Sequence, residues 1–379
     1  MIEKVFDVKK YIVVGAGILG ASTAYHLVKQ GADVTIVDRK DVGQATDAAA
    51  GIVCPWLAQR RNQRWYRLVR GGARYYPELI RQLEEDGETN TGYRKVGAIS
   101  LQRDEEKLEK TIERAKKRRE DGAPEIGEIT RLSPEQTKEF FPPISDGYLA
   151  IHVSGGARVN GRELRDALLR AAKSNGANFV KGSAELTFED KIVTGVQANG
   201  ERLEGEVIVA GGAWSRELLE PLGVEFLVTP QKAQIVHLEV PGVETGDWPV
   251  IMPPNNQYLL AFDGGRVVIG ATHEREAGFD PRSTAGGLHY IFDKALEVAP
   301  GLYDSTLVET RVGFRPFTPG SLPVFGAVPE TKGLYVANGL GASGLTSGPY
   351  VGAELARLVL GQETELDPND YDVAEAIQE

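Results

Sequence analysis

The sequence predicts a mixed α/β fold in which two domains are interleaved along the chain. The first observation is a β–α–β unit at the start, with an apolar strand over Tyr11–Val14, a helix over Ala16–Gln30 and a β-branched strand over Asp33–Asp38. The second is an antiparallel pattern in the middle, where residues 179–208 alternate between apolar and polar. The third is the length of 379 residues, which exceeds what one compact core usually holds.

Composition narrows the class of protein. Hydrophobic residues make up 41% and charged residues 26%, as in a soluble globular protein. The net charge of −11 disfavours nucleic acid or an anionic membrane as the main partner. Cys54 is the only cysteine, so no internal disulfide or cysteine-rich metal site can form, and we expect a cytoplasmic location. The first ten residues, MIEKVFDVKK, lack the apolar stretch of a signal peptide.

Two stretches without Asp, Glu, Lys or Arg are long enough to suggest membrane spans, residues 11–28 and 333–353. Both are too polar for that role, and they contain three and six glycines respectively. Uncharged, glycine-dense stretches more often wrap a ligand. We therefore expect no transmembrane segment, and a ligand in contact with both stretches.

The remaining elements follow in chain order after a loop at residues 43–56. Helical periodicity predicts further helices at about Arg64–Glu85, Gly161–Ser174, Thr284–Val298 and Gly348–Leu360, the last of them amphipathic. Residues 103–121 are dense in charge, which is typical of a solvated helix face. Ser133, followed by Pro134 and Gln136, marks another helix start with a capping box.

The strands of the middle region are predicted from alternation and turn residues. Residues 179–208 turn at Glu189-Asp190-Lys191 and at Asn199-Gly200, which predicts a small antiparallel meander. Pro230–Val240 and Gln257–Ala271 are predicted to belong to a second sheet. No internal repeat or low-complexity segment is evident.

Residues 15–20 read GAGILG and place Gly15, Gly17 and Gly20 in the GxGxxG spacing. Gly15 allows the tight turn out of the strand, Gly17 lets the backbone approach a pyrophosphate, and Gly20 lets helix and strand pack closely. The pyrophosphate then rests on N–H groups at the amino end of the helix, where the macrodipole favours negative charge. Asp38 ends the second strand, where a carboxylate can bind a ribose 2′-hydroxyl.

This motif leaves the identity of the ligand open. A glycine-rich turn without a ligand is one alternative. Asp38 argues against a 2′-phosphate because two negative groups would meet, although Arg39 beside it is typical of NADP sites. The spacing alone does not separate NAD from FAD, so an NAD-dependent dehydrogenase is a rival interpretation.

Four segments resemble the D-amino-acid oxidase family of FAD enzymes, which includes glycine oxidase, sarcosine oxidase and D-amino-acid dehydrogenase. They are GAGILG with Asp38, ATDAAAGIV at 45–53, VIVAGGAWS at 207–215, and GFRPFTPGSLPVFG at 313–326 with GLYVANGLGASGLTSGP at 333–349. The resemblance runs nearly end to end and is specific for the family, not for a substrate. It implies a Rossmann-type FAD-binding domain (parallel sheet with antiparallel meander) and an α+β substrate-binding domain built on an antiparallel sheet. The implied boundaries are residues 1–88, 150–226 and 316–379 for the first domain, and 89–149 and 227–315 for the second.

The resemblance also implies which residues contact non-covalent FAD. The segment at 45–52 would line the pyrophosphate, ribityl chain and flavin, Ala184 would contact adenine, and the loop at 339–346 would hydrogen-bond the flavin pyrimidine edge. The full implied set is Gly15, Ala16, Gly17, Ile18, Leu19, Gly20, Asp38, Arg39, Ala45, Thr46, Ala48, Ala49, Ala50, Gly51, Ile52, Ala184, Ala210, Gly211, Trp214, Arg315, Gly339, Gly341, Ala342, Ser343, Gly344, Leu345 and Thr346.

The loop before the last helix has a physical reason to face a flavin. The positive end of the helix dipole would lie near the flavin N1–C2 carbonyl, where hydride transfer places negative charge. The alternative for this glycine cluster is a flexible surface loop.

Two residues are candidates for substrate binding. Arg315 matches an arginine that grips the substrate carboxylate in the family, and a guanidinium fork pairs with a carboxylate through two hydrogen bonds. Tyr258 matches a pocket tyrosine of glycine oxidase. The alternatives are a structural salt bridge for Arg315 and an ordinary half-buried strand residue for Tyr258. His273 either lines the pocket or simply ends a strand, and no His or carboxylate cluster has metal-ligand spacing, so we expect no metal.

The chain departs from the family pattern at three positions. Ala342 stands where glycine oxidase has a second arginine, and Arg60 and Arg61 are candidates to replace it. Gly313 stands where sarcosine oxidase has a flavin-linking cysteine, which is why we expect non-covalent FAD. Val268 stands where that branch has a lysine associated with oxygen, so the use of oxygen is left open.

Together these residues predict an enzyme that oxidises the C–N bond of a small amine or amino acid of the glycine, sarcosine or D-amino-acid type. Hydride transfer from the substrate to flavin N5 would give an imine that hydrolyses to an oxo acid. Oxygen or a quinone-type acceptor would take the electrons, and a homo-oligomer is possible. The rivals are a partner-dependent flavoprotein subunit of a hetero-oligomeric dehydrogenase, and oxidation of a 2-hydroxy acid or a sugar-modified amino acid.

Overall fold

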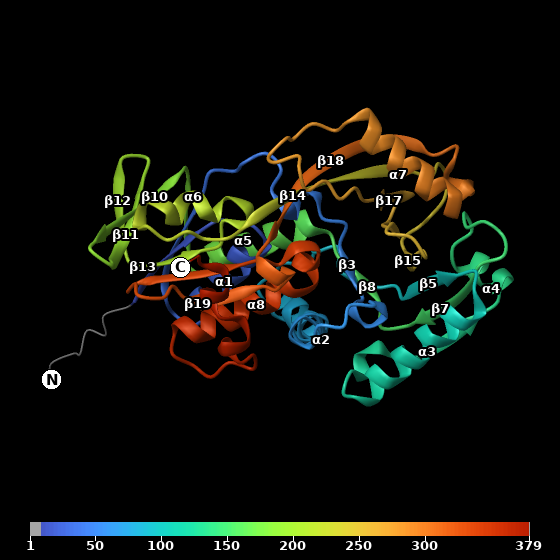
Figure 1. Cartoon of the computed structure of the whole chain (residues 1–379), viewed down its shortest axis with the longest axis horizontal. Helices are drawn as coiled ribbons and strands as arrows, with labels where there is room; N and C mark the ends of the chain where they lie inside the picture. The colour runs from blue at the N-terminus through green and yellow to red at the C-terminus, as the bar shows by residue number, and fades with distance from the viewer. Residues whose placement is uncertain (1–8, 379) are drawn as a thin grey trace.

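The computed structural model describes residues 9–378. Most of the segment MIEKVFDVKK lies outside these residues, and so does most of the region for which we predicted no signal peptide. The molecule is elongated, with one large sheet toward each end (Figure 1). The six-stranded sheet has the order β19-β20-β13-β1-β2-β9, and the eight-stranded sheet has the order β18-β14-β17-β16-β15-β5-β7-β6. This arrangement agrees with the predicted mixed α/β fold. The domain boundaries inferred above stay a prediction.

The predicted β–α–β unit forms the centre of the six-stranded sheet. β1 pairs in parallel with β2 on one side and with β13 on the other, and α1 connects β1 to β2. The connecting helix is slightly shorter than the predicted Ala16–Gln30. The strands of this sheet are β1 (Lys10–Val14), β2 (Asp33–Asp38), β9 (Asn178–Lys181), β13 (Glu206–Val209), β19 (Val324–Ala327) and β20 (Leu334–Asn338).

The antiparallel meander is shorter than predicted. It consists of β10 (Ala184–Glu189), β11 (Ile192–Ala198) and β12 (Glu201–Glu204), with turns at the predicted positions. Both ends of the predicted segment 179–208 are wrong, because β9 and β13 pair in parallel with β2 and β1. Strands of both sheets alternate with a period of two residues, so the pattern could not tell which sheet each strand joins.

The eight-stranded sheet contains the other predicted strands. Residues 257–271 form the hairpin of β16 and β17, and the long strands β14 and β18 pair along nearly their whole length. The strands are β5 (Ala98–Gln102), β6 (Ile129–Leu132), β7 (Leu149–Val153), β14 (Thr229–Glu239), β15 (Val250–Met252), β16 (Tyr258–Ala261), β17 (Arg266–Gly270) and β18 (Thr306–Phe317). A small sheet completes the fold, made of β3 (Ile52–Val53), β8 (Ala157–Arg158) and β4 (Arg94–Lys95).

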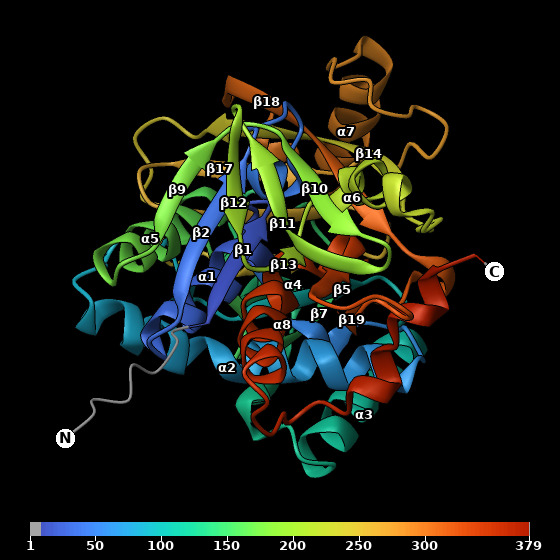
Figure 2. The same ribbon diagram turned by 90° about the vertical axis from the view of Figure 1, so that its left-hand side faces the viewer.

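Helices cover one face of the six-stranded sheet, as Figure 2 shows for α1 and α8, and the meander covers the other. Successive residues of β1 accordingly enter different cores: Tyr11 and Val13 lie in the core with these helices, whereas Ile12 lies in the core with the meander. The helices are α1 (Ile18–Lys29), α2 (Gln63–Glu85), α3 (Glu105–Glu120), α4 (Pro134–Phe140), α5 (Gly161–Ser174), α6 (Ser215–Leu219), α7 (Ala285–Val298) and α8 (Gly344–Val359). Within residues 9–378, no helix is both long enough and apolar enough to cross a membrane.

The predicted helix details are mostly confirmed. The capping box of Ser133 and Gln136 is present at the start of α4, and α3 is a charged helix with one buried face. The last helix is different, because α8 begins at Gly344 instead of Gly348 and all its residues are buried or half-buried. It packs against both α1 and α2, so more than one face of the helix is covered.

Candidate active site

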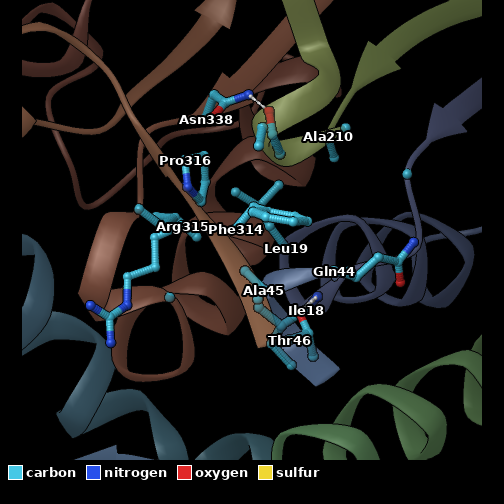
Figure 3. Close-up of a pocket in the computed structure, with 18 of the residues that line it drawn as sticks. Ile18, Leu19, Gln44, Ala45, Thr46, Ala210, Phe314, Arg315, Pro316 and Asn338 are labelled. Atoms are coloured by element: carbon cyan, nitrogen blue, oxygen red, sulfur yellow. Dashed lines mark hydrogen bonds between the residues drawn. The ribbon is translucent and has the colours of Figure 1, made fainter. Parts of the chain in front are cut away.

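A cavity of about 700 Å³ lies between the six-stranded and eight-stranded sheets. Its wall combines the turn after β1, the loop from Gln44 to Pro55, residues 182–186, the turn after β13 and the loop after β20. The strand β18 closes the cavity. Figure 3 shows that Phe314 and Arg315 extend from this strand to opposite sides.

The caps of the helices distinguish this cavity from the rest of the molecule. Of the eight α-helices in residues 9–378, α2, α3, α4, α5 and α7 begin with an N-cap side chain that accepts a hydrogen bond from a backbone N–H. The other three have no such side-chain bond, and their N-cap residues Gly17, Trp214 and Ser343 all line the cavity. The positive dipole ends of α1 and α8 therefore favour an anionic or electron-rich group bound between them.

Asp38 presents its carboxylate at the amino end of α1. Its two oxygens accept hydrogen bonds of 2.6 Å from the Ala16 and Lys40 amides, and Gln44 Nε2 lies 3.0 and 3.2 Å from them. The residue is only 6% exposed and lines the cavity. These donors hold the carboxylate in one orientation, as binding a ribose requires.

The glycines of the first turn have different structural roles. Gly15 has a φ of 106°, and a Cβ there would lie 2.4 Å from the Ala210 carbonyl oxygen, so the turn accepts only glycine. A Cβ on Gly20 would lie 1.9 Å from the Gly15 carbonyl oxygen, within the contact between helix and strand. Gly17 has open space, since the nearest atom, Thr46 Oγ1, would be 3.4 Å away. These positions agree with the reasons given for the motif.

Most residues predicted to bind the cofactor line the cavity. They are Gly15, Gly17, Ile18, Leu19, Asp38, Arg39, Ala45, Thr46, Ala48, Ala49, Ala50, Gly51, Ile52, Ala184, Ala210, Gly211, Trp214, Arg315, Gly339, Gly341, Ala342, Ser343, Gly344, Leu345 and Thr346. Ala16 and Gly20 are not among the lining residues. The Ala16 amide donates a hydrogen bond to Asp38, and Gly20 lies in the contact between α1 and the turn after β1. The Arg39 guanidinium forms ion pairs with Asp41 and Glu217.

At one end of the cavity Arg315 meets Tyr258 and His273. Arg315 Nη1 lies 2.9 Å from His273 Nδ1 and 3.3 Å from Gln231 Oε1. Tyr258 lines the same cavity. No carboxylate of residues 9–378 forms an ion pair with Arg315, so the predicted alternative of a structural salt bridge does not apply. Burial raises the pKa of Tyr258 despite the nearby Arg315 charge, so its hydroxyl stays protonated.

The residues that depart from the family pattern lie at different places relative to the cavity. Gly313 and Ala342 line the cavity, and a Cβ on Gly313 would lie 2.8 Å from Ala48 Cβ. Val268 is buried within β17. Neither Arg60 nor Arg61 is a lining residue: Arg60 stacks on Trp65 and donates to the Ser321 carbonyl, and Arg61 is exposed. The structure thus does not bring these two arginines to the site.

Sequence reasoning missed several polar lining residues. Asn338 Nδ2 donates to the Gly212 carbonyl and to Ser215 Oγ, and its Oδ1 accepts from the Gly339 amide, which ties two cavity loops together. Gln44 and Asn256 were also missed. The position of Asn338 at the carboxyl end of a parallel strand was a usable signal. Cys54 also borders the cavity, and burial raises the pKa of its thiol to about 12.

Residues 10–358 match the protein family described as DAO, FAD dependent oxidoreductase. The chain belongs to this family. Members of the DAO family depend on FAD, which decides between the two dinucleotides that the first motif left open. The prediction of FAD as the cofactor is therefore confirmed.

Three similar proteins represent the relatives of this DAO-family chain. The uncharacterized oxidoreductase YurR of Bacillus subtilis (strain 168) is 64% identical over 371 residues, which cover 97% of this chain and 100% of YurR. The crystal structure of iminodiacetate oxidase (IdaA) from Chelativorans sp. BNC1 has a TM-score of 0.93 and 45% identity, covering 96% of this chain and 98% of that one. Glycine oxidase of Pseudomonas aeruginosa is 29% identical over 370 residues, covering 96% and 98%. The predicted family, fold class and enzyme class are confirmed.

The cavity of this DAO-family enzyme fits FAD. The open space at Gly17 and the two uncapped helix ends form a cradle that a dinucleotide can enter, whereas the close packing at Gly15 and Gly313 leaves no room for larger side chains. The cavity extends from Asp38 to Arg315, so a nucleotide and a small carboxylate can occupy its two ends. Within residues 9–378, no group of three or more His, Cys, Asp or Glu residues is arranged to hold a metal ion.

Proposed function

We propose that this enzyme oxidises the C–N bond of a small glycine-type amino acid, including glycines that carry a substituent on nitrogen. The observation that carries the proposal is the guanidinium of Arg315, which faces the cofactor cavity with only uncharged partners. A half-buried cation without a counter-ion is a binding site for an anion, and a guanidinium fork matches a carboxylate. The similarity to iminodiacetate oxidase and glycine oxidase supports this class of substrate.

In this proposal the cavity residues hold FAD without a covalent bond. Asp38 binds the ribose, the amino end of α1 with Thr46 receives the pyrophosphate, and Ala184 contacts the adenine. The loop at 45–52 and the loop at 339–346 enclose the flavin. Bound FAD supplies the chemistry by accepting a hydride from the substrate carbon next to nitrogen.

The protein's own side chains orient the substrate. Arg315 binds the carboxylate, and the protonated Tyr258 hydroxyl donates a second hydrogen bond from β16. Fixing the substrate in this way can remove several kcal/mol from a barrier, because the reacting atoms need no further ordering. No side-chain base is needed if the amine enters deprotonated. The imine product then hydrolyses to an oxo acid and an amine or ammonia.

Substituted glycines belong in the proposed substrate class for two reasons. Iminodiacetate oxidase is 45% identical to this chain, whereas glycine oxidase of Pseudomonas aeruginosa is 29% identical. Ala342, a small residue exposed to the cavity, also leaves room beside the start of α8. We further propose that the enzyme works in the cytoplasm and passes its electrons to oxygen or to a quinone.

The variant Arg315→Met tests the assigned substrate site. We expect kcat/KM for a carboxylate substrate to fall by about 30- to 5,000-fold, because truncating one partner of a buried charge pair typically costs about 2–5 kcal/mol. Arg131→Met is the matched control, since it removes an arginine from the opposite edge of the same sheet. Unchanged kinetics in an FAD-loaded, folded Arg315→Met enzyme would refute the proposal.

An anaerobic screen identifies the substrate. Bleaching of the flavin absorbance is measured with glycine, sarcosine, iminodiacetate, proline, D- and L-amino acids and 2-hydroxy acids. We expect bleaching by at least one glycine-type amine and none by 2-hydroxy acids. Reoxidation by air or by a quinone then distinguishes an oxidase from a dehydrogenase.

A further inference from the structure

Two hydrogen-bond partners of Arg315 come from the strand β14 and from the segment that follows β17 in the eight-stranded sheet. Gln231 stands opposite Arg315 in the register of β14 and β18, and its Oε1 lies 3.3 Å from Arg315 Nη1. His273 follows β17 in the chain, and its Nδ1 lies 2.9 Å from the same Nη1 atom. The imidazole therefore makes the shorter of the two contacts.

The protonation of His273 follows from its partners. A guanidinium can only donate, so Nδ1 of the ring must accept and the ring proton must sit on Nε2. Burial first, and then the charges of Arg315 and Arg275, lower the pKa of His273 below its ordinary value. The ring is consequently neutral near pH 7.

A neutral partner affects the charge of Arg315 differently from a carboxylate partner. Lys232, the neighbour of Gln231 on β14, is 1% exposed and lies 3.6 Å from Glu274 and 3.5 Å from Asp280. Those carboxylates balance its charge inside the protein. His273 instead fixes the direction of the Arg315 guanidinium and leaves its positive charge available to a ligand.

We propose that His273 is a positioning residue, which holds Arg315 by accepting one guanidinium hydrogen bond so that the remaining donors face the substrate carboxylate. This inference rests on the proposed function, because it assumes that Arg315 binds a carboxylate. His273 itself acts through Arg315.

The location of His273 supports this role. A second cavity of about 940 Å³ lies beside the first, and Asn256 and His273 line both cavities. Arg315 lines only the first cavity, and Arg275 only the second. The imidazole thus lies in the wall between Arg315 and the outer cavity. If it turned outward, the guanidinium would lose its closest partner.

Three substitutions of His273 test whether its hydrogen-bond acceptor or the shape of its imidazole ring is what matters. His273→Asn keeps an oxygen acceptor close to the place of Nδ1, His273→Leu removes the acceptor, and His273→Asp adds a counter-ion for Arg315. Each holoenzyme is titrated with acetate, and the flavin absorbance spectrum gives the Kd. KM and kcat are measured with the substrate found in the screen, and flavin content and Tm report on folding. His289→Leu, which removes an exposed imidazole from α7, is the control.

We expect the acetate Kd and KM to rise about tenfold in His273→Leu and about 100-fold in His273→Asp, while kcat changes by less than about threefold. His273→Asn should stay within about threefold of the parent enzyme in every parameter. An Asn variant as weak as the Leu variant, or unchanged Leu and Asp variants, would overturn the positioning role. Arg315→Met is titrated in parallel: if it too binds acetate like the parent, the proposed function fails as well, and if it loses binding, only the role of His273 fails.

Discussion

Replacing Asp38 by Asn should weaken FAD binding more than it destabilises the apoprotein. The carboxylate accepts short hydrogen bonds from the Ala16 and Lys40 amides and a longer one from Gln44. In Asp38→Asn, one oxygen becomes an NH2 group that faces a backbone N–H, and the charge that attracts a ribose hydroxyl is lost. A hydrogen bond to a charged group is worth about 1.5–3 kcal/mol, so we expect the Kd for FAD to rise about 10- to 100-fold.

Quenching of flavin fluorescence during titration of apoprotein with FAD measures this effect. Asp33→Asn is the matched control, because Asp33 stands at the exposed other end of the same strand β2. The Tm of each apoprotein separates loss of binding from loss of structure. A Kd within twofold of the parent, with an unchanged apoprotein Tm, would show that Asp38 does not contribute to cofactor binding and would refute the reasoning.

Two further predictions concern acid stability and the mode of FAD attachment. His26 is held neutral by burial, which lowers its pKa from 6.5 to about 4, so the unfolded chain takes up its proton first as the pH falls. The free energy of unfolding should therefore decline below pH 6.5, by about 2 kcal/mol between pH 7 and pH 5, as measured by urea unfolding. An equally steep decline in the variant His26→Gln would contradict this cause. In the variant Gly313→Cys, the new Cβ would lie 2.8 Å from Ala48 Cβ, so we expect a lower FAD content and no covalent link to the flavin. Flavin retained in the acid-precipitated protein would contradict that expectation.

The parts of the site that were predictable are local in sequence. The strand, turn and helix around Gly15 and Gly17 follow from residues close together in the chain, and Asp38 ends the next strand. The capping box at Ser133 has the same local character. Short-range hydrogen bonds and backbone sterics decide such features, so one segment is sufficient to predict them.

The contacts that could not be predicted depend on distant pairing. His273 and Arg315 meet because β17 and β18 both pair with β14, and no pattern in either segment specifies that register. The same limit explains why β9 and β13 were placed in the wrong sheet. Asn256 and Gln44 lie in loops without periodicity, where only the assembled structure shows which side chains face the cavity.

The strand β18 runs between the two ends of the cavity to which we assign the cofactor and the substrate. Its first half pairs only with β14, but near Phe314 its free edge meets the loop of the cofactor site: the Phe314 amide donates to the Gly43 carbonyl, and Gln44 and Phe314 form an isolated parallel bridge. Because side chains alternate along a strand, Phe314 packs on Trp214 while Arg315 extends the other way, toward His273 (Figure 3). One strand therefore fixes Arg315, the proposed carboxylate-binding group, relative to the loop that is proposed to enclose the flavin. A shift of its register by one residue would reverse both side chains, so the pairing of β18 with β14 determines which side of the strand Arg315 faces.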